Sequence, residues 1–167
     1  MSSSQKLYNI CDKKRGIKMD KHICKAKVIW DMSSRKENEW VYGYYVALPD
    51  EYTHGKDICH AIFSLDCEHV CMGEYKDYGW YEVDPKTVCR CTGKEDKHGN
   101  PIFENDIVIG KANIPMRVHW DKVCAKFLVV YKMDGIGWCE NLLCDSERLE
   151  VIGNTFNNTE LMEDTIC

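Results

Sequence analysis

Cysteines that could hold a metal ion are concentrated in the middle of the chain. The candidate ligands are Cys59, Cys67, Cys71, Cys89 and Cys91. Soft thiolates suit tetrahedral zinc, and the Cys67-x3-Cys71 spacing fits a zinc knuckle. The spacing of Cys89 and Cys91 is too tight for that pattern, and alternation along a strand would turn Cys59 away from the neighbouring His60. Because free cysteine is commonly a small buried apolar group, we predict buried thiols and no metal or other cofactor.

Three other kinds of chemistry have weaker support. No segment around the eleven cysteines or six histidines resembles the setting of a catalytic nucleophile. Asp96, Asn100 and Glu104 suggest calcium ligands, but the run 97–99 breaks the register of an EF-hand loop. The segment 110–115 lacks the second Gly-Lys-Ser/Thr of a phosphate-binding loop. We therefore predict no catalytic residue and a protein that is not an enzyme.

Aromatic side chains are the strongest candidates for binding. The candidate residues are Trp40, Tyr42, Tyr44, Trp120 and Trp138. Strand alternation places the first three on one face. Tyr and Trp are enriched at protein interfaces, and exposed rings can also hold peptides or stack on bases. We expect most of these rings to be core, and the functional hypothesis is that the remainder form an aromatic partner surface.

The elements that must position these residues are short strands joined by polar turns. Composition and alternation predict strands at 23–30, 40–48, 58–63, 79–83, 106–110, 116–120, 125–131 and 148–154. Asp84-Pro85 predicts a short helical turn, 98–101 a tight turn, 134–138 another turn, and 157–164 a final helical turn. Strands this short, without a long amphipathic helix, indicate an all-β barrel or sandwich.

Composition is that of a globular chain, with 44% hydrophobic and 29% charged residues in 167. No run approaches the ~20 apolar residues of a membrane span, and the first ten residues do not resemble a secretory signal. We therefore expect a cytoplasmic protein without a membrane partner. The odd number of cysteines argues against a disulfide framework in that compartment.

Charge is distributed unevenly. Residues 1–27 carry eight Lys or Arg and two Asp, a net charge of +6, whereas the other 140 residues carry a net charge of −11. The basic segment predicts a flexible, solvated arm. Two nucleic-acid roles are the alternatives: the arm binds nucleic acid directly, or the acidic body acts as a decoy that inhibits a host nucleic-acid-binding defence protein.

Three segments in order resemble the YopX family. The stretch EVDPKTVCRCTGKEDKHGNPIFENDIVI (Glu82 to Ile109) is similar to the family pattern acidic-Val-Asp-Pro-x-Thr-Val, then Thr-Gly-x-x-Asp-x-x-Gly, then Ile-Phe/Tyr-Glu-x-Asp-Ile-Val. EWVYGYYV (39–46) resembles the family's N-terminal Trp-Val-Tyr-Gly segment, and EVIGNTFNNTELM (150–162) resembles its closing segment. The resemblance covers roughly residues 23–163.

The resemblance implies a genetic setting and a fold rather than a mechanism. Members of the family occur mainly in phages and prophages of Gram-positive bacteria, and the fold is implied to include an SH3-like β-barrel in the C-terminal part. No biochemical activity is established for the family. The residues matching its pattern, with structural roles implied, are Asp84, Pro85, Thr92, Gly93, Gly99, Asp106, Gly153 and Asn154. Asn105 departs from the family, which commonly has Gly there, and we expect Asp106 to mark an exposed strand edge.

These observations predict an all-β protein in three parts. They are a basic arm (1–22), a small β-rich N-terminal part (23–84) and an SH3-like barrel with few helical turns (85–167). The expected function is that of a phage- or prophage-encoded, non-enzymatic interaction protein. Its expected partner is another protein, either a host protein or a second copy of the chain, with nucleic acid as the alternative.

Overall fold

The computed structural model describes residues 21–30, 38–49, 58–64, 80–133 and 136–163. The chain divides into two compact units, the N-terminal unit (1–90) and the C-terminal unit (91–167). Most of the predicted basic arm, residues 1–20, lies outside the described residues. None of the helices in the described ranges is long and apolar enough to cross a membrane.

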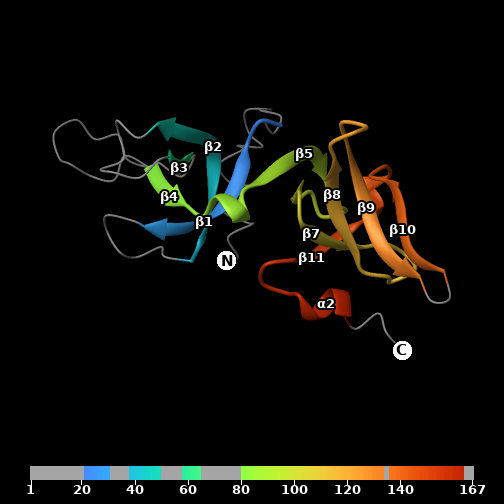
Figure 1. The fold of residues 1–167 in the computed structure, drawn as a ribbon. Coiled ribbons are helices and arrows are strands. Elements are labelled where there is room, and N and C mark those ends of the chain that lie inside the picture. Colours follow the sequence, from blue (N-terminus) through green and yellow to red (C-terminus); the bar gives the residue numbers. More distant parts are fainter. Residues whose placement is uncertain (1–20, 31–37, 50–57, 65–79, 134–135, 164–167) are drawn as a thin grey trace. The chain divides into compact units, whose positions relative to one another are not determined.

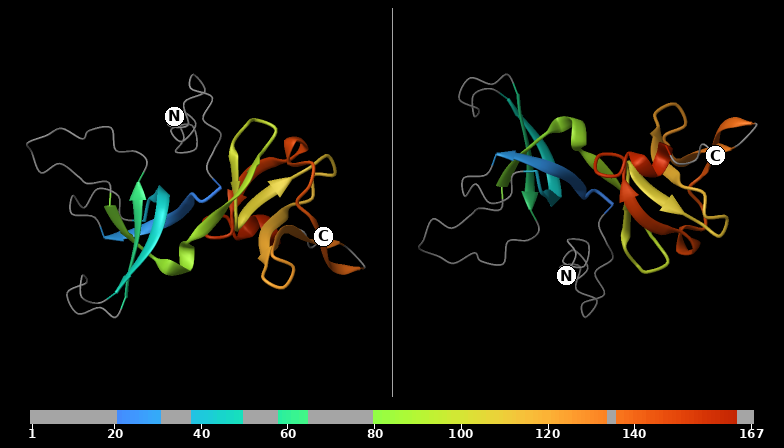
Figure 2. Two further views of the ribbon diagram at one scale, coloured as in Figure 1. Left: turned by 90° about the horizontal axis from the view of Figure 1, so that it is seen from above. Right: turned by 90° about the horizontal axis from the view of Figure 1, so that it is seen from below.

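Four strands of the N-terminal unit close into a small barrel (Figures 1 and 2). They are β1 (Cys24–Trp30), β2 (Trp40–Pro49), β3 (Ile58–Ser64) and β4 (Trp80–Val83). Each pairs antiparallel with the next, and β4 returns to pair with β1, so the ring of hydrogen-bonded strands is complete. Full closure removes the strand edges that these elements would otherwise expose.

Small apolar side chains fill the inside of this barrel. The buried cluster consists of Cys24, Ala26, Val28, Val41, Ile62, Tyr81 and Val83. Its members alternate along each strand, as the period of two requires. The intervening residues, among them Lys27 on β1 and Tyr44 on β2, therefore belong to the outer face of the barrel.

A threonine-centred clasp joins the turn after β4 to the middle of β1. Asp84 caps the one-turn helix η3 (Pro85–Thr87) by accepting a hydrogen bond from the Lys86 amide at 2.9 Å. The buried Thr87 hydroxyl accepts from the Lys27 amide at 2.9 Å and donates to the Asp84 carbonyl at 2.8 Å. The Asp84 amide donates in turn to the Lys27 carbonyl. These bonds satisfy both backbone groups of Lys27, and the predicted helical turn with proline at its start is confirmed.

The C-terminal unit is built on a five-stranded antiparallel sheet (Figure 1). The chain enters it along β5 (Cys89–Glu95), which pairs with β6 (Pro101–Phe103). The strands β7 (Asp106–Ile109), β8 (Met116–Asp121), β9 (Lys126–Met133) and β10 (Gly137–Leu142) form a meander. After the one-turn helix η4 (Ser146–Arg148), β11 (Glu150–Asn154) pairs with β7, and the described elements end with α2 (Glu160–Glu163). The fifth strand thus lies beside the first, as in an SH3-like barrel.

The predicted all-β class with few helical turns is confirmed, but several strands were missed or misassigned. β5 and β6 were not predicted as strands. Residues 134–138 were predicted as a turn, whereas Gly137 and Trp138 begin β10 and pair with β9. The sequence of β10, GWCENL, does not alternate between apolar and polar residues. Trp138, Glu140 and Asn141 are exposed and Cys139 is only half-buried, so neither face of this last described strand is buried enough to require alternation.

Candidate interaction surface

The cysteines considered as candidate zinc ligands do not form a metal-binding group in the part of the chain that the structure describes. No group of three or more Cys, His, Asp or Glu with metal-binding geometry is found among those residues. Cys67 and Cys71 lie outside the described ranges. Cys59, Cys89 and Cys91 are buried, and the Cys89 thiol donates to the Thr87 carbonyl at 3.2 Å. These three thiols have the surroundings of small core residues.

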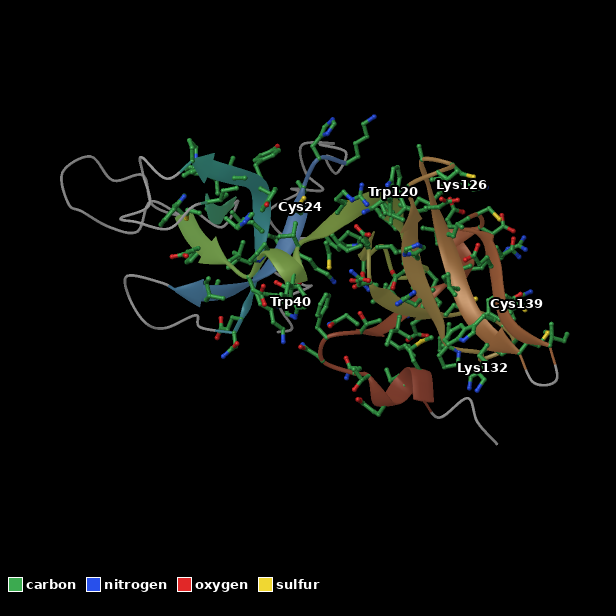
Figure 3. All side chains as sticks on the ribbon, in the orientation of Figure 1. Cys24, Trp40, Trp120, Lys126, Lys132 and Cys139 are labelled. Carbon is green, nitrogen blue, oxygen red and sulfur yellow. The ribbon has the colours of Figure 1, made fainter. Side chains whose placement is uncertain are left out.

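Trp40, labelled in Figure 3, lies on the outer face of the N-terminal barrel, and two lysines of the adjacent strand lie beside it. Lys27 is directly opposite Trp40 in the β1–β2 pairing, and Lys25 is opposite Tyr42. The Nζ atoms of Lys25 and Lys27 are 5.2 Å and 5.7 Å from the centroid of the Trp40 ring. Ammonium groups at this distance are attracted to the negative face of the indole. Both lysines are therefore engaged by an aromatic ring.

A row of three aromatic side chains continues across the outer face from β2 to β4. Tyr44 is directly opposite Phe63 of β3, and Phe63 is directly opposite Trp80 of β4. Side chains directly opposite each other on antiparallel strands have Cβ atoms roughly 5 Å apart. We call Tyr44, Phe63 and Trp80 the aromatic row. Tyr44 is 44% exposed and Phe63 is 45% exposed, while Trp80 is half-buried.

Of this row, only Tyr44 was among the five residues chosen as binding candidates. Trp80 was counted with the aromatic residues of the chain but was not chosen, and Phe63 was not considered. The register of three strands brings them together, and no periodicity within one strand carries that information. Tyr42, which was a candidate, is buried.

The other two predicted aromatic residues belong to the C-terminal unit. Trp120 packs edge-on against Phe127, its cross-strand neighbour, with ring centroids 4.8 Å apart. Trp138 is 64% exposed on β10, opposite Lys132 of β9. The five predicted aromatic residues are thus divided between two units, with Trp40, Tyr42 and Tyr44 on one strand face.

A polar pair lies on the inner side of the N-terminal barrel. The Tyr45 hydroxyl is 2.6 Å from Nδ1 of His60, and the two rings are stacked with centroids 6.0 Å apart. Burial, with a smaller contribution from the nearby Cys24, raises the pKa of the Tyr45 hydroxyl. The two half-buried side chains satisfy each other's polar groups beside the apolar cluster, which is a structural role.

Asp96 organises the turn between β5 and β6 and joins it to β11. One carboxylate oxygen accepts from the amides of His98 and Asn100, at 2.9 and 2.8 Å. The other accepts from the Asn100 side chain and from the Val151 amide of β11, both at 3.2 Å. Burial alone would raise the pKa of Asp96, but the bonds from Asn100, Val151 and His98 outweigh it, so the pKa lies below its ordinary value. Gly99, with φ of 78°, makes the predicted tight turn.

Asp106 was expected at an exposed strand edge, and that expectation was wrong. Its side chain is 1% exposed, and its carboxylate accepts from the Phe103 amide at 2.8 Å. The hydrogen bond explains how a carboxylate is accommodated inside the unit. The preceding Asn105 has φ of 64°, a left-handed conformation that asparagine tolerates better than most residues. Asn105 therefore adopts the left-handed conformation that the glycine common in the family would also adopt easily.

The remaining residues of the resemblance shape a bulge and a turn. The Thr92 hydroxyl donates to the Ile102 carbonyl at 2.8 Å, and Gly93 has φ of 72° where the β5–β6 register shifts. A Cβ atom on Gly153 would lie 2.5 Å from Oδ1 of Asn158. The Asn154 side chain accepts from the Phe156 amide at 3.0 Å and the Asn157 amide at 3.1 Å. These residues hold the scaffold together.

The family model described as YopX protein matches residues 30–163, which is most of the chain and extends over parts of both units. No curated protein matches the sequence.

Proposed function

The chain belongs to the YopX family, and from that premise we propose that it is a phage- or prophage-encoded, non-enzymatic protein that binds another protein through its aromatic row. We further propose that it acts in the cytoplasm of a Gram-positive host. The exposed row of Tyr44, Phe63 and Trp80 is the observation that carries this proposal.

The chemistry of the row suits a protein partner. Tyr and Trp supply large, rigid contact area with little loss of side-chain entropy, and Tyr adds a hydroxyl that can reach a polar group. The row stands on the outside of a closed barrel whose interior is filled by its own cluster. Because strands in a closed ring are held by neighbours on both sides, the rings are presented on a rigid support. The expected occupant is an apolar segment of another protein.

Nucleic acid is the second candidate, since Lys25 and Lys27 share the outer face with these aromatic rings. Single-stranded nucleic acid combines base stacking on aromatic rings with phosphate contacts from basic residues. However, both lysines lie over Trp40, and the N-terminal unit as a whole has fourteen basic and fourteen acidic residues. A surface without excess positive charge gains little from releasing the counterions of a phosphate backbone. The protein partner is therefore the better-supported proposal.

The decisive experiment compares capture by two variants. Lysate of a Gram-positive bacterium, with and without nuclease treatment, is incubated with the tagged protein, with a Tyr44→Thr/Phe63→Thr double variant and with a Trp138→Thr control. Threonine keeps the strand propensity while removing the ring. We expect a specific protein to be retained by the unmodified chain and by the control, and lost from the double variant. Calorimetry with the purified protein should then show at least about tenfold weaker binding for the double variant.

Two results would contradict the proposal. If the double variant and the control capture the protein equally, the aromatic row is not part of the interface. The other result is that every sample loses its captured protein after nuclease treatment and that the affinity falls steeply as salt is raised. Nucleic acid would then be the better-supported partner. Circular dichroism of the double variant ensures that loss of binding is not loss of fold.

A further inference from the structure

The two ends of the C-terminal sheet differ in what lies against them. At the β11 end, the Lys97 amide donates to the Leu149 carbonyl at 2.8 Å, and the Val151 amide donates to Asp96 at 3.2 Å. The β5–β6 turn thus occupies the outer side of β11. At the other end, β10 is the last strand, and no other described strand pairs with it (Figure 1). This end of the sheet is an open edge in the described part of the chain.

The sequence of β10 has little of the usual protection of such an edge, since its one charged residue is the exposed Glu140. It has neither lysine nor proline, and its pairing with β9 runs without a bulge from Gly137 to Leu142. Natural proteins commonly use those three devices to keep edge strands from pairing with other chains. Trp138, 64% exposed, adds a large apolar side chain to the same strand.

Hydrogen-bond alternation identifies the groups that face outward. The Leu143 amide donates to the Phe127 carbonyl, which continues the β9–β10 register by one residue. Antiparallel partners alternate between bonded and non-bonded pairs, so odd-numbered residues of β10 bond to β9. The backbone groups of Trp138 and Glu140 therefore point away from β9, toward the open edge.

We infer that β10 pairs antiparallel with β10 of a second copy of this chain, forming a symmetric dimer with Cys139 at its centre. A two-fold axis perpendicular to the sheet keeps each side chain on its own face, so it must pass through a residue pair of the same number. Centred on Glu140, the pairing would oppose two carboxylates, which is unfavourable. Centred on Cys139, it sets Trp138 of each copy opposite Glu140 of the other, and the like-charge contact disappears.

The Cys139-centred register is complementary to itself. On one face, Trp138 would lie between Lys132 of its own β9 and Glu140 of the second copy, so that the ring is covered and a cation and an anion flank it. The outward backbone groups would make roughly four hydrogen bonds across the two-fold axis. Cys139 would meet its counterpart in a non-bonded pair, where opposite side chains come closest. A single strand pair is a small interface, so the dimer should be weak.

The test uses two substitutions at one outward-facing position. Glu140→Pro removes an amide that points to the open edge, which proline can do on an edge strand without breaking the bonds to β9. Glu140→Thr removes the same carboxylate but keeps the amide. In sedimentation equilibrium up to the order of 100 µM, the unmodified chain and Glu140→Thr should dimerise, with Glu140→Pro at least about tenfold weaker.

Cross-linking supplies a second readout that does not depend on the proline variant. Diamide, which takes up the two thiol hydrogens as a disulfide forms, should link two chains through Cys139. The link should be lost in Cys139→Ser and retained in Cys124→Ser, whose cysteine is exposed whereas Cys139 is half-buried. A monomeric unmodified chain, undiminished association of a folded Glu140→Pro, or a cross-link that persists in Cys139→Ser would each overturn the inference.

Discussion

The two units of this protein both consist of antiparallel strands around a buried apolar cluster, and they differ in where their aromatic and acidic side chains lie. In the N-terminal unit an apolar cluster fills a closed ring, and aromatic rings are left on the outside. In the C-terminal unit, buried carboxylates tie turns to strands, with Asp96 and Asp106 at the centres of these contacts. Charge follows the same division, since the C-terminal unit has thirteen acidic and eight basic residues, whereas the N-terminal unit has no net charge.

The comparison separates family recognition from binding. Most of the residues that resemble the family pattern make caps, bulges and turns, and they are concentrated between Asp84 and Asp106. The aromatic row depends instead on the register of three strands. A signature of this kind therefore identifies a scaffold, and the surface that it presents has to be found from the structure.

Removing the Asp96 carboxylate should produce the largest difference between the units. Asp96→Ala leaves the amides of His98, Asn100 and Val151 without their acceptor, so we expect the C-terminal unit to lose about 3 kcal/mol of stability. Amide hydrogen exchange should rise in peptides from 91–163. An equal rise in peptides from 21–30 and 38–49 would show that the units unfold together and would break the comparison.

Titration should affect the units at opposite ends of the pH scale. The pKa of Asp96 is lower in the folded state than in the unfolded state. Its contribution to folding stability is therefore complete above the unfolded-state pKa and is lost as pH falls through the folded-state pKa. Acid below about pH 4 should weaken the C-terminal unit through this group. The raised pKa of Tyr45 has the opposite consequence, and its contribution is lost as pH rises above about 10.

The variants Asp96→Ala and Tyr45→Phe isolate these two contributions. Urea unfolding across the pH range should show that Asp96→Ala flattens the acid limb and Tyr45→Phe flattens the alkaline limb. If the dependence of stability on pH is unchanged in both variants, other titrating groups are responsible for it.

Removing the hydroxyl of one threonine in each unit should have a smaller effect on stability and allows the two units to be compared through the same substitution. Thr87→Val keeps the shape of the side chain but removes the acceptor of the Lys27 amide, and we expect the N-terminal unit to lose about 1–2 kcal/mol. Thr92→Val is the matched change in the C-terminal unit, where it removes the bond to the Ile102 carbonyl. Thermal unfolding followed by hydrogen exchange should locate each loss in its own unit.

The smallest expected effect is at Asn105. Because its φ is 64°, Asn105→Gly should change stability by less than about 0.5 kcal/mol, whereas Asn105→Ala should cost about 1 kcal/mol. Chemical denaturation of the two variants measures this difference. A glycine variant that is as unstable as the alanine variant would show that contacts of the asparagine side chain, rather than its backbone, decide the turn.

Local patterns were sufficient for much of the fold. The β1–β2 hairpin, the Asp84-Pro85 turn and the tight turn at Gly99 each depend on residues close in sequence, and each was predicted. The burial of Asp106 was not, because its hydrogen bond to the Phe103 amide depends on how two short strands meet. For the same reason neither Phe63 nor the open edge of β10 could be assigned to a surface before the pairing of strands was known.

The threefold pairing of β1 has a consequence for synthesis of the protein. β1 can pair with β2 as soon as both have been synthesised. Its pairings of Val28 with Val83 and of Lys25 with Cys89 can form only after β4 and β5 have been synthesised. Thr87, likewise, lies 60 residues beyond the Lys27 amide that it binds. Closing so long a loop costs entropy before the new contacts compensate for it. A nascent chain interrupted before residue 90 would therefore expose strand edges that the finished protein conceals, and would be a substrate for chaperones or proteases.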